Sequence, residues 1–213
     1  MISLVCILNV SLEKEIKDLK TKAQEREQKI THLEKELSRA HNENDELESY
    51  VRRQCLVINN LKPENGKTDL ELFMNFCDTH FAGLNITSDS ISKLHRLPRN
   101  PNNQTDNDKP LALVVKFTKD MVRDSLFKNK KNLKAKGITI TELLTGKRSQ
   151  LLSKCIEKIP YEPIPRAIWT DNGRILVKLA DNRPALIKTN EDLEKLIREI
   201  PQYIANVASS AAP

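Results

Sequence analysis

Apolar residues recur at alternating steps of three and four along residues 12–51, a stretch without proline or glycine. This spacing is typical of a coiled coil, because it keeps one apolar line facing a partner helix. The a and d positions of its single register are Leu12, Ile16, Leu19, Ala23, Arg26, Ile30, Leu33, Leu37, Ala40, Asn44, Leu47 and Val51. A lone buried asparagine fixes the register of a coil at some cost in stability. The pattern predicts a coiled-coil oligomerisation stalk over residues 1–53.

Charges beside this seam favour a parallel arrangement. In a parallel pair each g residue faces the next e residue of the partner helix. Three such pairs have opposite signs, Glu15–Lys20, Lys22–Glu27 and Lys29–Glu34. We therefore expect a homo-oligomer, and the pattern leaves a dimer and a trimer open. The alternative is a single amphipathic helix packed against its own domain.

Residues 54–141 follow the order strand, helix, strand, strand, helix, strand. The expected strands are 55–58, 91–96, 111–117 and 138–140, and the expected helices are 70–81 and 120–130. This order predicts a split βαβ domain, in which two helices cover one face of a four-stranded sheet. The other face is then expected to be free for a ligand. Alternation along 91–96 does not determine which side of that strand is buried.

Residues 142–200 predict a small α+β domain, so the fold class of the whole chain is α+β. A helix is expected over 143–159, and strands over 167–169 and 174–179 flank the hairpin signal Asp171-Asn172-Gly173. A short strand at 185–188 precedes a helix that Asn190 is expected to cap and Pro201 to end. Residues 201–213 are expected to form a flexible tail.

Charge is distributed unevenly along the 213 residues, whose net charge is +6. Residues 1–53 hold 10 Lys/Arg against 11 Asp/Glu, whereas the remainder holds 25 against 18. An excess of positive charge outside the stalk suggests a polyanionic partner. Aromatic residues make up only 4% of the chain, which limits base stacking.

Motifs for catalysis and metal binding are absent from the sequence. It has no phosphate loop, nucleophile elbow or HExxH helix, and its four cysteines lie far apart with no CxxC pair. The first ten residues are apolar but short and lack a basic leader, so a signal peptide is not expected. We expect a protein that is not an enzyme, has no cofactor or metal, does not act on a membrane or a small molecule, and resides in the cytoplasm or nucleus.

A basic cluster spans residues 116–136, with eight lysines and arginines against two aspartates. Such a cluster neutralises phosphates without reading bases, although a solvated helix face has the same composition. Trp169 is a candidate for base stacking, with a core position as the alternative. The candidate nucleic-acid contacts are Arg96, Arg99, Lys116, Lys119, Arg123, Lys128, Lys130, Lys131, Trp169, Arg174, Lys178 and Arg183.

Four short motifs occur in a characteristic order, at residues 95–98 (HRLP), 115–117 (VKF), 141–145 (TELLT) and 169–173 (WTDNG). Over about residues 30–200 the chain resembles the few-polyhedra protein family of baculoviruses. It is also similar to the first-open-reading-frame proteins of LINE-type retrotransposons. This resemblance implies a coiled-coil stalk, an RNA-recognition-motif-like domain and a small C-terminal domain. In the retrotransposon relatives the last two hold single-stranded nucleic acid between them, which by position implies contacts at Arg96, Lys116, Arg123, Arg174 and Lys178.

Together these patterns predict a homo-oligomer that binds single-stranded nucleic acid, with RNA favoured over DNA. The expected strands 55–58 and 111–117 lack the aromatics on which RNA-recognition motifs stack bases, so phosphate contacts are expected to dominate. The alternative is a coiled-coil scaffold that binds proteins and has no nucleic-acid role.

Overall fold

The structure is a computed structural model that describes residues 2–98, 109–159, 167–178 and 184–210. It combines helices with antiparallel sheets, as expected for the α+β class. The chain divides into two compact units, Met1–Leu47 and Glu48–Pro213.

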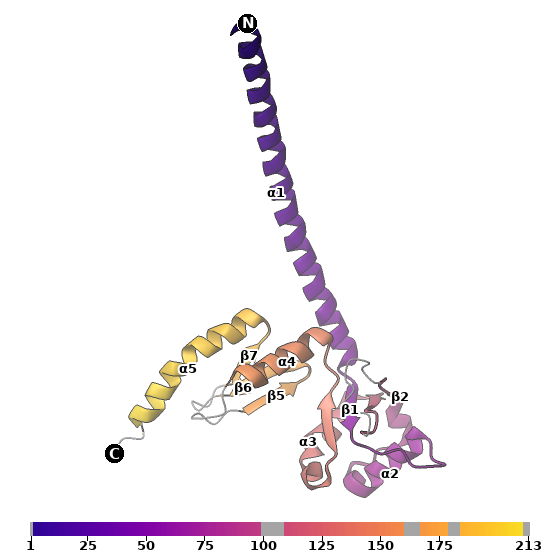
Figure 1. Cartoon of the computed structure of the whole chain (residues 1–213). Helices are drawn as coiled ribbons and strands as arrows, with labels where there is room; N and C mark the ends of the chain where they lie inside the picture. The colour runs from indigo at the N-terminus through magenta and orange to yellow at the C-terminus, as the bar shows by residue number, and fades with distance from the viewer. Residues whose placement is uncertain (1, 99–108, 160–166, 179–183, 211–213) are drawn as a thin grey trace. The chain divides into compact units, whose positions relative to one another are not determined.

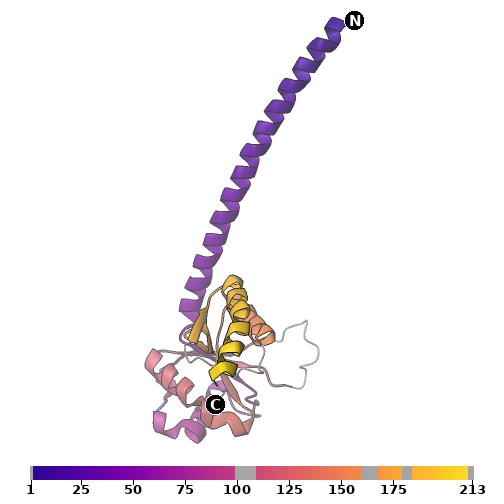
Figure 2. The ribbon, with the colours of Figure 1, turned by 90° about the vertical axis from the view of Figure 1, so that its left-hand side faces the viewer.

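The first unit consists of one uninterrupted helix, which is the indigo end of the ribbon in Figures 1 and 2. This helix, α1 (Ile2–Arg52), continues into the second unit for its final turn. Large apolar side chains of the seam, from Leu12 to Leu37, are 49–65% exposed. The helical conformation predicted for this stretch is therefore confirmed. No other part of the first unit packs against these apolar side chains.

The second unit contains a four-stranded sheet with the strand order β2-β3-β1-β4. Its strands are β1 (Cys55–Asn59), β2 (Ile91–Arg96), β3 (Leu113–Phe117) and β4 (Thr139–Glu142), and all neighbours are antiparallel. The helices α2 (Asp69–Phe81) and α3 (Asp120–Asn129) follow β1 and β3, which is the predicted order of elements. Short 3-10 turns lie at Ala82–Leu84, Ser88–Ser90 and Lys130–Lys136.

Alternating residues divide this sheet into two faces. Leu56, Ile58 and Val115 lie on the inner face, in one core with Phe73 of α2 and Leu126 of α3. The residues that alternate with these along each strand lie on the opposite face, which we call the outer face of the first sheet. Its centre is not open as expected, because Cys55, Val57 and Val114 are at most 7% exposed there. Leu97, Ala112 and Leu143, which directly flank β2, β3 and β4, pack against them.

A three-stranded sheet follows, with the order β5-β6-β7. The strands β5 (Ala167–Asp171) and β6 (Arg174–Lys178) form the expected hairpin, and β7 (Pro184–Ile187) adds to β6. Asn172 and Gly173 have φ of 51° and 74°, the left-handed conformation that a two-residue hairpin turn requires at both positions. One face of this sheet packs on α4 (Gly146–Lys158) and α5 (Asn190–Ser210) through Ile175, Val177 and Ile187.

The helix α5 differs from the sequence expectation at both ends. Its cap is Thr189 rather than Asn190, because Thr189 and Asp192 exchange reciprocal hydrogen bonds between side chain and backbone N–H. Pro201 does not end the helix, which continues to Ser210, so residues 201–210 are helical rather than a flexible tail. A proline removes one donor and disfavours, but does not forbid, continuation of a helix.

The cysteines of the second unit are buried thiols. Cys55, Cys77 and Cys155 each lie in a hydrophobic core, as expected for small apolar side chains. Burial raises the pKa of the Cys77 thiol from 9.0 to about 12. Burial also raises the pKa of the Cys55 and Cys155 thiols, which disfavours the reactive thiolate form at all three positions.

Candidate nucleic-acid interface

Arg96, expected as a phosphate contact, is held inside the domain. Its position on β2 is paired with Leu113, so its side chain lies on the inner face beside the first turn of α2. The guanidinium donates to Asp69 Oδ1 at 2.8 Å, and to the Leu61 and Leu111 carbonyl oxygens at 2.8 and 2.7 Å. Its side chain is 14% exposed. Arg96 therefore joins three segments of the domain, which corrects its expected role as a surface contact.

Arg123 is also structural rather than a surface contact. Its side chain is 3% exposed and forms ion pairs with Asp124, at 2.8 Å, and with Glu142. Burial by itself would lower the pKa of Arg123, but hydrogen bonds to Glu142 and Asp124 raise the pKa above its ordinary value. The guanidinium therefore stays charged and has its partners within the protein, which corrects the second of the expected contacts.

Glu142 extends this buried ion pair to the hairpin of the second sheet. Its carboxylate accepts hydrogen bonds from the backbone N–H groups of Asn172, at 2.8 Å, and Gly173, at 3.2 Å. Both N–H groups of this turn donate to the one carboxylate, and successive backbone N–H groups in a turn are an arrangement that binds anions. One carboxylate thus ties α3, β4 and the β5–β6 turn together.

A second group of contacts surrounds the same turn. Arg148 donates to the Gly173 carbonyl oxygen at 3.0 Å and to Ser49 Oγ at 2.7 Å. Ser49 lies in the last turn of α1, and Arg52 of that turn donates to the Leu144 carbonyl oxygen at 2.6 Å. The β5–β6 turn is therefore attached to the end of α1 as well as to the first sheet.

The basic cluster of residues 116–136 is divided by the first sheet. Lys116 belongs to the outer face, whereas α3, with Lys128 in its last turn, packs on the inner face. Lys130 lies 3.5 Å from the centre of the Phe127 ring, and burial lowers the pKa of its ammonium group. Lys119, Lys128 and Lys131 are exposed. The sheet therefore separates Lys116 from the basic residues of α3, and these side chains do not converge on one groove.

Lys116 instead lies opposite a second lysine, a pairing that the sequence pattern did not predict. On the outer face Lys93 of β2 lies directly opposite Lys116 of β3. Lys93 is exposed and Lys116 half-buried, and neither has an ion-pair partner among the residues that the structure describes. Like charges directly opposite each other destabilise a sheet unless an anion lies between them. Alternation along 91–96 places Lys93 and His95 on one face, but only the pairing with β3 determines which face is covered.

The remaining candidates gather on the second sheet. Trp169, Arg174 and Lys178 lie on the face that α4 and α5 leave uncovered, because their neighbours in sequence form the core with these helices. Trp169 is 36% exposed, so it is not the core residue of the alternative interpretation. Arg99 and Arg183 lie outside the described residues.

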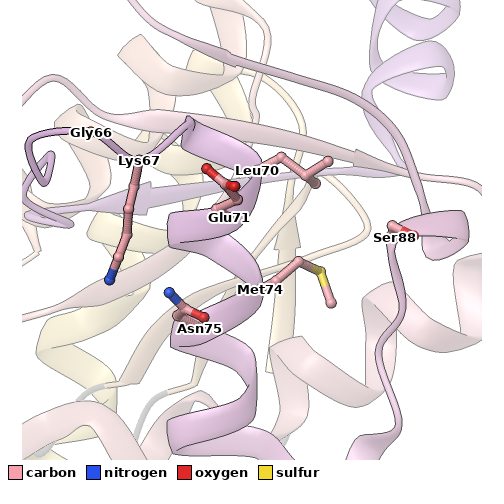
Figure 3. A pocket seen from close by; sticks show the side chains of 7 residues that line it. All are labelled: Gly66, Lys67, Leu70, Glu71, Met74, Asn75 and Ser88. Carbon is pink, nitrogen blue, oxygen red and sulfur yellow. The ribbon is translucent and has the colours of Figure 1, made fainter.

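A shallow pocket of about 380 Å³ lies along α2 and is separate from these surfaces (Figure 3). Its lining consists of Gly66, Lys67, Leu70, Glu71, Met74, Asn75 and Ser88. Thr68 caps α2, the Glu71 carboxylate accepts a hydrogen bond from the Thr68 backbone N–H at 2.7 Å, and Lys67 pairs with Glu64 at 2.5 Å. The charged groups of the pocket are therefore engaged in local structure, and α2 covers the inner face, away from Lys93 and Lys116.

Comparison with protein-family models and with curated proteins found no match to this chain. Among the described residues, no cluster of His, Cys, Asp and Glu is arranged to hold a metal ion. In the same part of the chain, no helix combines the length and apolar character needed to cross a bilayer.

Proposed function

We propose that this chain is a non-enzymatic, homo-oligomeric protein that binds single-stranded nucleic acid mainly through phosphate contacts. The observation that carries the proposal is the pair Lys93 and Lys116, two cations opposite each other without a carboxylate among the described residues. A phosphate between the two ammonium groups removes their repulsion and gains two charge-assisted hydrogen bonds.

The surroundings of this pair favour a chain of phosphates over a single anion. Exposed Lys119 lies two residues after the end of β3, so a third cation follows the strand that carries Lys116. The outer face has Cys55, Val57 and Val114 at its centre and no aromatic side chain among these residues. Such a face offers phosphate contacts but no ring for base stacking, which favours sequence-tolerant binding.

The finer assignment of the domains belongs to the same proposal. The element order and the strand order β2-β3-β1-β4 match a split βαβ arrangement, and they support our assignment of residues 54–141 to an RNA-recognition-motif-like domain. We assign residues 142–200 to a small C-terminal domain, and residues 1–53 to a parallel coiled coil. The motif resemblance to few-polyhedra proteins and to LINE-type retrotransposon proteins supports this assignment, and it favours RNA over DNA.

Oligomerisation through α1 increases the strength of binding without adding contacts. The exposed seam needs a partner helix to bury it, and a second copy supplies the same heptad pattern. Copies joined by a coil present several basic faces to one strand, so later contacts form at high effective concentration.

The test is binding of the full chain to a labelled, mixed-sequence single-stranded RNA at several salt concentrations, with a duplex of the same sequence alongside. We expect affinity to fall steeply with salt and to be lower for the duplex. Lys93→Glu with Lys116→Glu should weaken binding and reduce the salt slope by about 0.7, the value for the one phosphate that the pair shares.

The matched control is Lys14→Glu with Lys35→Glu, which changes the net charge equally at f positions of the stalk. This control should bind nearly as the unmodified chain does. Equal losses in the two variants would show that net charge, rather than the Lys93–Lys116 pair, drives binding. No binding at low salt would overturn the proposal in favour of a protein scaffold.

A further inference from the structure

The face of the second sheet that α4 and α5 leave uncovered carries an apolar row, which we call the tryptophan row. Trp169, Leu176 and Leu186 lie opposite one another across β5, β6 and β7. Trp169 is 36% exposed and Leu186 38% exposed, and Leu176 between them is half-buried. None of the three belongs to the core that holds the sheet to its helices.

Cations flank this row on the central strand. Arg174 and Lys178 lie two residues before and after Leu176, so they share its face at about 7 Å along the strand. Arg174 pairs with Asp171 at 2.5 Å, and both side chains are about half exposed. Lys178 has no ion-pair partner among the residues that the structure describes.

The size and charge of this face indicate which kind of ligand it binds. A stable protein interface buries about 800 Å² on each partner, whereas the tryptophan row is one side chain wide and bounded by charge. A nucleotide matches it better, because a base has a flat apolar surface and its phosphate is an anion. Indole is a strong stacking partner for bases, and such stacking needs no particular base.

We infer that the tryptophan row is a base-stacking site, in which one unpaired base lies on the Trp169 indole and the adjacent phosphates contact Lys178 and Arg174. This inference rests on the proposed function and adds the reason for a preference for single strands. A duplex keeps its bases stacked on each other and cannot offer a free base face. The outer face of the first sheet then binds phosphates, while the second sheet binds a base.

The fluorescence of the chain reports directly on this site, because Trp169 is its one tryptophan. The experiment titrates the full chain with single-stranded oligouridylate and with an abasic strand of the same length. Binding is measured in parallel by competition with a labelled RNA. We expect oligouridylate to quench Trp169 fluorescence and the abasic strand to bind without quenching.

Two substitutions separate stacking from apolar volume. Trp169→Phe retains an aromatic face and should retain most of the affinity, whereas Trp169→Leu retains volume without the ring and should weaken binding by about tenfold. Both variants should bind the abasic strand about as tightly as the unmodified chain does, because that strand has no base to stack on residue 169. A circular dichroism spectrum like that of the unmodified chain shows that the fold is intact in each.

The outcomes distinguish this site from the proposed function. RNA binding without quenching, or equal quenching by the abasic strand, overturns the stacking site and leaves phosphate binding in place. Equal affinities of Trp169→Leu and Trp169→Phe for oligouridylate also overturn it. No RNA binding at low salt overturns both proposals.

Discussion

The carboxylate of Glu142 accepts a hydrogen bond from the Arg123 guanidinium, and each of these side chains is only 3% exposed. A buried ion pair is costly to break from one side, because the remaining charge has neither water nor a partner. A charge reversal at Arg123 would place three carboxylic acids together and would report on folding rather than on nucleic-acid binding.

Removal of Glu142 should therefore destabilise the second unit strongly. Glu142→Ala leaves Arg123 with Asp124 alone and leaves two hairpin N–H groups without their acceptor, so we expect the free energy of unfolding to fall by about 3–5 kcal/mol. Glu142→Gln keeps one acceptor oxygen and should be intermediate. Urea unfolding followed by circular dichroism measures both. Glu194→Ala breaks the exposed pair with Lys158 and should change stability little; an equal loss there would contradict the argument.

Gly173 should be the least replaceable glycine among those described. Its φ is 74°, and an added Cβ would lie 2.7 Å from Ser49 Oγ and 3.3 Å from Arg148 Nη1. Gly173→Ala should lower the free energy of unfolding by about 1–3 kcal/mol through backbone strain and displaced contacts. The control is Gly83→Ala, where φ is ordinary and no atom lies within 4 Å of the added carbon. Thermal unfolding should separate the two variants, and coincident transitions would contradict this role of the turn.

The seam of α1 should determine oligomeric state independently of the second unit. Leu33 and Leu37 are 52% and 57% exposed in the single chain. Leu33→Glu with Leu37→Glu places charges at adjacent d and a positions, so sedimentation equilibrium should give the mass of a monomer. Gln28→Glu with Ser38→Glu changes charge away from the seam and should leave the mass unchanged. An unaltered mass in the seam variant would exclude this line of contact.

Stability should decrease in acid partly through Asp192. The backbone N–H of Lys188, with a contribution from that of Thr189, donates to this carboxylate at 2.9 Å and holds its pKa below the ordinary 3.8. Because the folded state favours the ionised form, the stabilisation is present above pH 3.8 and is lost as pH falls through the lowered pKa. Asp192→Asn should be less stable than the unmodified chain at pH 7, and the difference should begin to shrink near pH 4 and vanish below the lowered pKa. Urea midpoints across this range test the prediction, and a constant difference between the two proteins would contradict it.

Features that depend on near neighbours were predictable from the sequence. The heptad spacing of α1, the Asp171-Asn172-Gly173 turn and the order of strands and helices all depend on residues within a few positions of one another. Periodicity and turn conformation are local, so the chain itself specifies them. The function that we propose uses these elements.

The position of each charged side chain was decided by the tertiary structure. Arg96 and Lys93 lie three residues apart on one strand, yet the first is held inside the domain and the second is exposed, because pairing with β3 determines which face each one occupies. Arg123 is buried since Glu142, 19 positions away, lies beside it. The sequence alone determined that a heptad-repeat helix precedes a region with an excess of basic residues. Only long-range packing decided which of the basic residues stabilise the fold and which remain available to a phosphate.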